Sequence, residues 1–163
     1  MKYKLITLKL NDQDLKYIKT IKRSLFSISN DPSFNIFPSL VVLGKTDLNN
    51  LNNVDIPSIN SKLVFNNNIE SNNKCSFIRS EKNEELYDLI NQICLNEDIK
   101  IYSKYFNLLQ EFNNLPIIHL GNSNNIAKEI KTIIIKDYRL ELIEININDN
   151  FISYKIIDSL HLS

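Results

Sequence analysis

Two short apolar runs that both end in glycine decide how this chain folds. The first reads FPSLVVLG, residues 37–44, and the second reads LPIIHLG, residues 115–121. In each, a proline is followed by aliphatic residues, a pattern typical of a buried strand. Gly44 and Gly121 are the only glycines in the sequence. Their shared place at the ends of these runs indicates two equivalent elements, one in each half of the chain.

The segments before each run also follow a similar order. Residues 3–10 alternate in hydrophobicity and predict a strand, and the segment 11–29 has apolar residues at helical spacing. In the second half, short strands are expected around 62–65 and 74–79. An amphipathic helix is expected to begin at Ser80. Each half therefore offers a helix followed by an apolar strand that ends in glycine.

The remaining segments are patterned unequally. Residues 45–60 are rich in asparagine and predict a loop, whereas residues 98–112 fit a helix or an extended chain equally well. A third helix is expected from Ser123. The last quarter alternates over 143–148 and again over 152–156, which is typical of a hairpin. The element order predicts an α+β protein.

Length and composition limit the classes of protein that this chain can be. Its 163 residues, of which 43% are hydrophobic, suit a single domain spanning 1–163 and made of two similar halves. The 19 basic and 19 acidic side chains cancel, so overall charge does not favour nucleic acid or an anionic membrane. Cys75 and Cys94 form no metal-binding pattern, and we expect buried thiols in a reduced compartment. Without a signal-peptide pattern or an apolar run of membrane-spanning length, we expect a cytoplasmic protein.

The two glycine-closed runs resemble the paired motifs of the 2H phosphoesterase superfamily, which includes the RNA 2′,3′-cyclic phosphodiesterases once called 2′-5′ RNA ligases. In that family each half carries a strand of the type P-H-[IL]-T-L-(L)-G, and the element order, with its closing hairpin, is similar. The resemblance implies a duplicated bilobal fold in which antiparallel sheets surround a central groove and helices lie outside. It also implies that two histidines and two hydroxyls line this groove, where imidazoles exchange protons and hydroxyls hold phosphate oxygens.

Aligned on their prolines and glycines, the two runs depart from the family pattern. Ser39 and Ile117 stand at the histidine positions, and Val41 and His119 stand at the threonine positions. A two-residue slip would place His119 at a histidine position, but it would break the agreement at Pro116 and Gly121 together. Valine and isoleucine cannot transfer protons, so the standard two-histidine mechanism is not expected. We expect Ser39, Val41, Ile117 and His119 to point into one groove between facing strands.

The remaining candidates for a chemical role are two histidines and four basic side chains. His119 is the only catalytic candidate, and any residual phosphate affinity is expected to depend on it and to be stronger at pH 5.5 than at pH 8. His161 is interpreted as part of a solvated strand face. The basic side chains of the predicted helix, Lys16, Lys19, Lys22 and Arg23, are expected on its solvated face, because the chain carries no net positive charge. No metal site, glycine-rich phosphate loop or cofactor is expected.

Three hypotheses for function follow. The first is a degenerate, catalytically inactive 2H phosphoesterase-like protein that binds RNA ends, nucleotides or a protein partner in the groove. The second is an atypical phosphodiesterase that acts on 2′,3′-cyclic phosphates through His119. The third is a small α+β regulatory domain unrelated to the family. The sequence does not indicate an oligomeric state.

Overall fold

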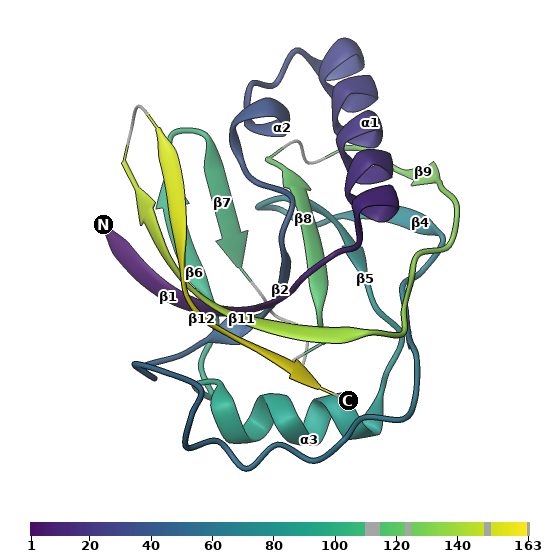
Figure 1. Ribbon diagram of the computed structural model, residues 1–163. Helices are drawn as coiled ribbons and strands as arrows, with labels where there is room; N and C mark the ends of the chain where they lie inside the picture. Colours follow the sequence, from purple (N-terminus) through teal and green to yellow (C-terminus); the bar gives the residue numbers. More distant parts are fainter. Residues whose placement is uncertain (110–114, 123–124, 149–150, 163) are drawn as a thin grey trace.

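The computed structural model describes residues 1–109, 115–122, 125–148 and 151–162. Over these ranges an eight-stranded, antiparallel sheet carries helices on one face, so the α+β class is confirmed (Figure 1). The first half and the closing hairpin contain β1 (Lys2–Leu8), α1 (Asp12–Ser29), α2 (Ser33–Ile36), β2 (Val41–Lys45), β11 (Tyr138–Ile147) and β12 (Ile152–Leu162). The second half contains β3 (Leu63–Val64), β4 (Asn68–Ser71), β5 (Ser76–Arg79), α3 (Glu84–Ile93), β6 (Lys100–Ser103), β7 (Phe106–Leu109), β8 (Ile117–Gly121), β9 (Lys128–Glu129) and β10 (Ile134–Ile135).

The two glycine-closed strands lie side by side at the centre of the sheet. The sheet runs β12-β11-β1-β2-β8-β5-β4-β9, so β2 and β8 are central, and four strands belong to each side. On one side α1 connects β1 to its antiparallel neighbour β2, and on the other α3 connects β5 to its antiparallel neighbour β8. In Figure 1, α1 lies above these strands and α3 below them.

The two sides also share a bulge at the same place. In the pairing of β1 with β2 the register skips Leu43, the residue before Gly44. In the pairing of β5 with β8 it skips Leu120, the residue before Gly121. A bulge adds one residue to one strand and increases the local twist. Both central strands are therefore bent at the same distance from their glycines.

Each glycine is needed because a neighbouring segment lies too close for a side chain. A Cβ atom on Gly121 would stand 2.5 Å from a ring carbon of Phe34 in α2, and one on Gly44 would stand 2.7 Å from Sγ of Cys94, which caps α3. Real Cβ atoms essentially never make such contacts. The glycine at the end of each central strand therefore packs against the segment that follows the helix of the other half.

Two hydrophobic cores cover the two faces of the sheet. The larger core joins α1 and α3 to strand residues such as Leu8, Val41 and Ile118. The smaller core lies on the other face, where the hairpin of β6 and β7 packs against residues such as Val42 and Ile117. The helix caps follow sequence rules, since Asn11 and Asn83 accept hydrogen bonds from the first turns of α1 and α3.

Several predictions about local structure are confirmed and others are wrong. The first strand, the first helix, the loop over 45–60 and the closing hairpin are all present, although the first strand ends at Leu8. The second helix is also present, but it begins at Glu84 and not at Ser80. The prediction of a third helix is wrong. Ser123 itself lies outside the described residues, and residues 125–135 form an extended chain in which Ile130 hydrogen-bonds to Asn67 and Ile135 pairs with Leu63. Within 98–112, β6 and β7 form a hairpin, and 110–112 lie outside the described residues.

Candidate functional site: a basic cavity beside the outer strand

The two glycine-closed strands do not face each other across a groove, and that prediction is wrong. They are hydrogen-bonded neighbours, with Val41 opposite Ile118 and Val42 opposite Ile117. Opposed residues share a face of the sheet. Val41 therefore points into the helix-covered core, whereas Ile117 points into the hairpin-covered core.

Counting from the glycines and their matching bulges, the structural counterpart of His119 is Val42. The counterpart of Ile117 is Leu40. The equivalence of Val41 with His119, which needed a one-residue gap between the two runs, is wrong. Side chains alternate between the two faces along a strand. An alignment error of one residue therefore places every side chain on the opposite face of the sheet. The four predicted site residues are therefore not brought together.

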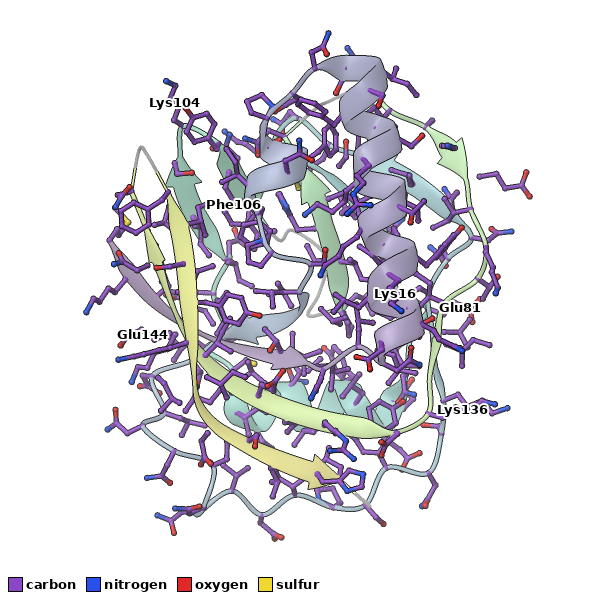
Figure 2. The ribbon with its side chains drawn as sticks, turned by 45° about the horizontal axis from the view of Figure 1, so that its top comes forward. Lys16, Glu81, Lys104, Phe106, Lys136 and Glu144 are labelled. Carbon is purple, nitrogen blue, oxygen red and sulfur yellow. The ribbon has the colours of Figure 1, made fainter. Side chains whose placement is uncertain are left out.

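The face that holds Ile117 and His119 is filled by aromatic side chains. The ring of Phe37, just after α2, stacks on the ring of Phe106 from β7, with centroids 3.5 Å apart and planes 7° from parallel. Both rings meet the imidazole of His119 edge-on, with centroids 5.0 and 4.1 Å away. Figure 2 shows Phe106 inside the molecule near α2, and Lys104 at the outer tip of the same hairpin. These rings close the space that the family resemblance assigns to a substrate.

His119 lies beneath this cluster and is completely buried. Its Nε2 donates to the main-chain oxygen of Asn107 at 2.8 Å, and its Nδ1 has no partner among the described residues. Burial, with a smaller contribution from the charge of Lys22 and against the effect of the Asn107 hydrogen bond, lowers the pKa of His119 to about 3. The imidazole is therefore neutral at pH 5.5 as well as at pH 8, which gives no support to a pH-dependent phosphate affinity through His119.

The structure instead offers a cavity of about 720 Å³ between α1, the segment that follows it and the outer strand β12. A volume of this size is typical of small-molecule sites. Of the four predicted site residues, Ser39 is the one that lines it. The full lining comprises Leu15, Lys19, Lys22, Arg23, Phe34, Asn35, Ile36, Phe37, Pro38, Ser39, Ile152, Ser153 and Tyr154.

Three cationic side chains on one face of α1 form a wall of this cavity. Lys19, Lys22 and Arg23 line it, whereas Lys16, one turn earlier, does not. Lys22 was expected on the solvated face of the helix, and this is wrong: it is 4% exposed, because its ammonium donates to the main-chain oxygen of Phe37. Burial, and after it the charge of Lys19, lowers the pKa of Lys22 to about 8. Lys22 therefore remains mostly protonated at neutral pH.

The charges of this wall are not balanced by the residues around them. No carboxylate lines the cavity, and none of Lys19, Lys22 and Arg23 forms an ion pair with a described residue. Lys22 is a buried cation without a counter-ion, and Lys19 and Arg23 lie exposed beside it. This arrangement favours an anionic ligand, which replaces the lost water contacts of Lys22. The arrangement can hold a phosphate or carboxylate group against α1.

A second cavity of about 590 Å³ lies at the start of α1. Its lining mixes basic residues with Asp12, Asp14 and Asp137, and the carboxylate of Asp137 contacts His161 and Arg139. His161 is exposed, as expected for a solvated strand face. Because three carboxylates line this cavity beside its basic residues, it is the weaker candidate for an anion.

Within residues 1–109, 115–122, 125–148 and 151–162, no group of three or more His, Cys, Asp or Glu side chains is placed to hold a metal ion. None of the helices described is long and apolar enough to cross a membrane. Cys75 is buried and Cys94 half-buried, and burial raises the pKa of both thiols to about 12.

No protein-family model matches this chain, and no curated protein is significantly similar to it.

Proposed function

We propose that this protein is a catalytically inactive relative of the 2H phosphoesterases that binds a nucleotide or RNA end through its phosphate in the basic cavity. The observation that carries the proposal is the unpaired cationic wall of Lys19, Lys22 and Arg23. Such donors bind phosphate oxygens by charge-assisted hydrogen bonds, which are about twice as strong as neutral ones.

The duplication that the family resemblance implies is supported by the internal symmetry of the fold. A duplicated ancestor would leave two strand-helix-strand units joined at the two glycine-closed strands, and the sheet order has this form. It would also leave equivalent irregularities, and the bulges before Gly44 and Gly121 are equivalent. Two independent features therefore favour a duplication over a chance likeness of two short motifs.

The loss of catalysis is supported by the environment of His119. A general acid or base must reach the reacting oxygen and must titrate near the working pH. His119 is fully buried, has its Nε2 engaged by Asn107 and remains neutral far below neutral pH. The atypical phosphodiesterase hypothesis would need this residue to leave its place under Phe37 and Phe106.

Calorimetric titration with adenosine 3′-monophosphate at pH 7 tests the proposal. We expect the native chain to bind, and each of Lys19→Ala and Arg23→Ala to weaken binding about tenfold or more, since a hydrogen bond to a charged group contributes about 1.5–3 kcal/mol. Lys16→Ala is the matched control, because Lys16 lies on the same helix outside the cavity. Absence of binding at millimolar nucleotide, or equal effects of all three substitutions, would refute the assignment.

A parallel assay separates the inactive protein from the active alternative. The native chain and His119→Gln are incubated with adenosine 2′,3′-cyclic phosphate, and product is measured by chromatography. We expect no turnover by either protein. Turnover by the native chain that His119→Gln abolishes would favour the phosphodiesterase hypothesis.

A further inference from the structure

The first residues of β12 form the wall of the cavity that faces α1. This wall is uncharged, whereas the wall on α1 is cationic. Ile152, Ser153 and Tyr154 line this side, and no charged residue lies among them. The cavity floor is also apolar, with Phe37 and Pro38 among its residues. One site therefore presents cations on one wall and an aromatic ring on the other.

The ring of Tyr154 is held at the edge of the hydrophobic core and is not covered by it. Tyr154 lies opposite Ile145 in the pairing of β11 with β12, and Ile152 lies opposite Ile147. Ile145 is completely buried, but Tyr154 on the neighbouring edge strand is 44% exposed. Its hydroxyl forms no hydrogen bond with any residue that the structure describes. A rigid, half-exposed ring in a cavity is a suitable surface for stacking.

We propose that Tyr154 is the base-stacking side chain of this cavity, so that the ligand is a nucleoside phosphate and not a phosphorylated sugar or free phosphate. The inference rests on the proposed function, since the phosphate is held by the opposite wall. Aromatic rings that stack on bases, combined with cations that hold the backbone, are the usual means by which proteins bind single-stranded nucleic acid. A phosphorylated sugar would use the cations and leave the ring and the apolar floor without a partner.

The same geometry predicts which bases bind better. Stacking on a ring requires only the π-face that every base has, so recognition should be tolerant of base identity. The larger ring system of a purine covers more of Tyr154 and of the apolar floor than a pyrimidine does. We expect adenosine and guanosine 3′-monophosphates to bind more tightly than the cytidine and uridine compounds.

Calorimetric titrations with adenosine 3′-monophosphate and with ribose 5-phosphate test the inference. We expect the native chain to bind the nucleotide about 5- to 150-fold more tightly, the factor that corresponds to a stacking contribution of about 1–3 kcal/mol. Tyr154→Ala should remove this difference and leave ribose 5-phosphate binding unchanged, whereas Tyr154→Phe should retain it. Phe151→Ala is the matched control, since Phe151 is a similarly exposed ring that does not line the cavity.

The outcomes separate the two proposals. Equal affinities for the nucleotide and the sugar phosphate, with both lost in Lys19→Ala, would overturn the role of Tyr154 and leave the phosphate site standing. Failure of both compounds to bind would overturn the phosphate site and the inference together. The chain has seven tyrosines and no tryptophan, so quenching of tyrosine emission by adenine gives a second readout. Part of that quenching should disappear in Tyr154→Phe although affinity is kept.

Discussion

The ammonium group of Lys22 donates a hydrogen bond to the main-chain oxygen of Phe37, whose ring stacks on Phe106. The charged wall of the cavity is thereby attached to the aromatic cluster beneath it. Lys22 is protonated at neutral pH although it is buried, because this carbonyl replaces part of its lost hydration. An anion in the cavity would supply the opposite charge that the free protein lacks.

Binding of adenosine 3′-monophosphate should weaken about tenfold between pH 7 and pH 9. The pKa of Lys22 in the free protein is about 8, so it is mostly charged at the first pH and mostly neutral at the second. The phosphate is already doubly ionised above its second pKa of about 6 and contributes little to the change. The other titratable groups that line the cavity are Lys19, Arg23 and Tyr154. Calorimetry at the two pH values measures the effect.

Lys22→Arg is the control for this prediction. A guanidinium stays charged at pH 9, so the variant should bind nucleotide with nearly the same affinity at both values. An equal weakening in the native chain and in Lys22→Arg would assign the pH dependence to another group.

Acid should destabilise the protein through His119. The unfolded chain binds a proton at this residue below about pH 6.5, whereas the folded chain binds it only near pH 3. Because the unfolded state takes up more protons between these values, the free energy of unfolding falls as the pH falls. From pH 7 to pH 5 the loss due to His119 should be about 2 kcal/mol. Urea denaturation at both values measures it.

The comparison variant is His119→Gln, which can still donate to the Asn107 carbonyl but does not titrate. Between pH 7 and pH 5, the free energy of unfolding of this variant should fall by about 2 kcal/mol less than that of the native chain. Parallel pH profiles for the two proteins would contradict the burial of a neutral imidazole.

Removing the Phe106 ring should cost about 3–5 kcal/mol of the free energy of unfolding, the range for a fully buried aromatic side chain replaced by alanine. Phe106 is 0% exposed and touches the rings of Phe37 and His119. Phe151→Ala, at a half-exposed position, should change stability by less than about 0.5 kcal/mol. Chemical denaturation of both variants gives the comparison. A small loss in Phe106→Ala would mean that the hairpin of β6 and β7 does not close this face of the sheet.

Alanine at Gly121 should destabilise the protein by about 1–3 kcal/mol, because the added methyl would overlap the ring of Phe34. Combining Gly121→Ala with Phe34→Leu should recover part of the loss, since the smaller side chain makes room. Thermal or chemical unfolding of the two single variants and the double variant forms a double-mutant cycle. Strictly additive effects would show that the two residues do not compete for the same space.

Elements with a strong local pattern could be predicted from the sequence. The helices beginning near residues 11 and 80 and the closing hairpin have clear periodicity, and the central strands are marked by their glycines. In contrast, β4 lies in an asparagine-rich segment, where it is held by pairing with β5 and not by its own composition. The third helix was predicted from isoleucines at helical spacing, such as Ile130 and Ile133, but these residues join the core from an extended chain. Tertiary contacts therefore determined the secondary structure of these segments.

The candidate site could be predicted only in part, because its walls come from distant segments. Ser39 was expected in a binding groove, but Lys19, Lys22 and Arg23 were expected on a solvated helix face, and nothing in the sequence placed Tyr154 near them. Tyr154 joins them through the fold, since the last strand of the chain forms the opposite wall. The errors at Val41 and Ile117 have a different origin. A bulge cannot be read from aliphatic residues, and a gap of one residue transfers a side chain to the other face of the sheet.

The position of β1 has a consequence for the synthesis of this protein. β1 leaves the ribosome well before β11, but in the sheet it lies between β2 and β11, and it pairs with β11 over its whole length. Because β11 begins at Tyr138 and translation adds roughly 5–20 residues per second, one edge of β1 waits on the order of ten seconds for its partner. During that interval an unpaired strand edge is open to pairing with other chains. Premature termination before Tyr138 would make that exposure permanent, so nascent chains of this protein should depend on cellular chaperones more than the small size of the finished domain suggests.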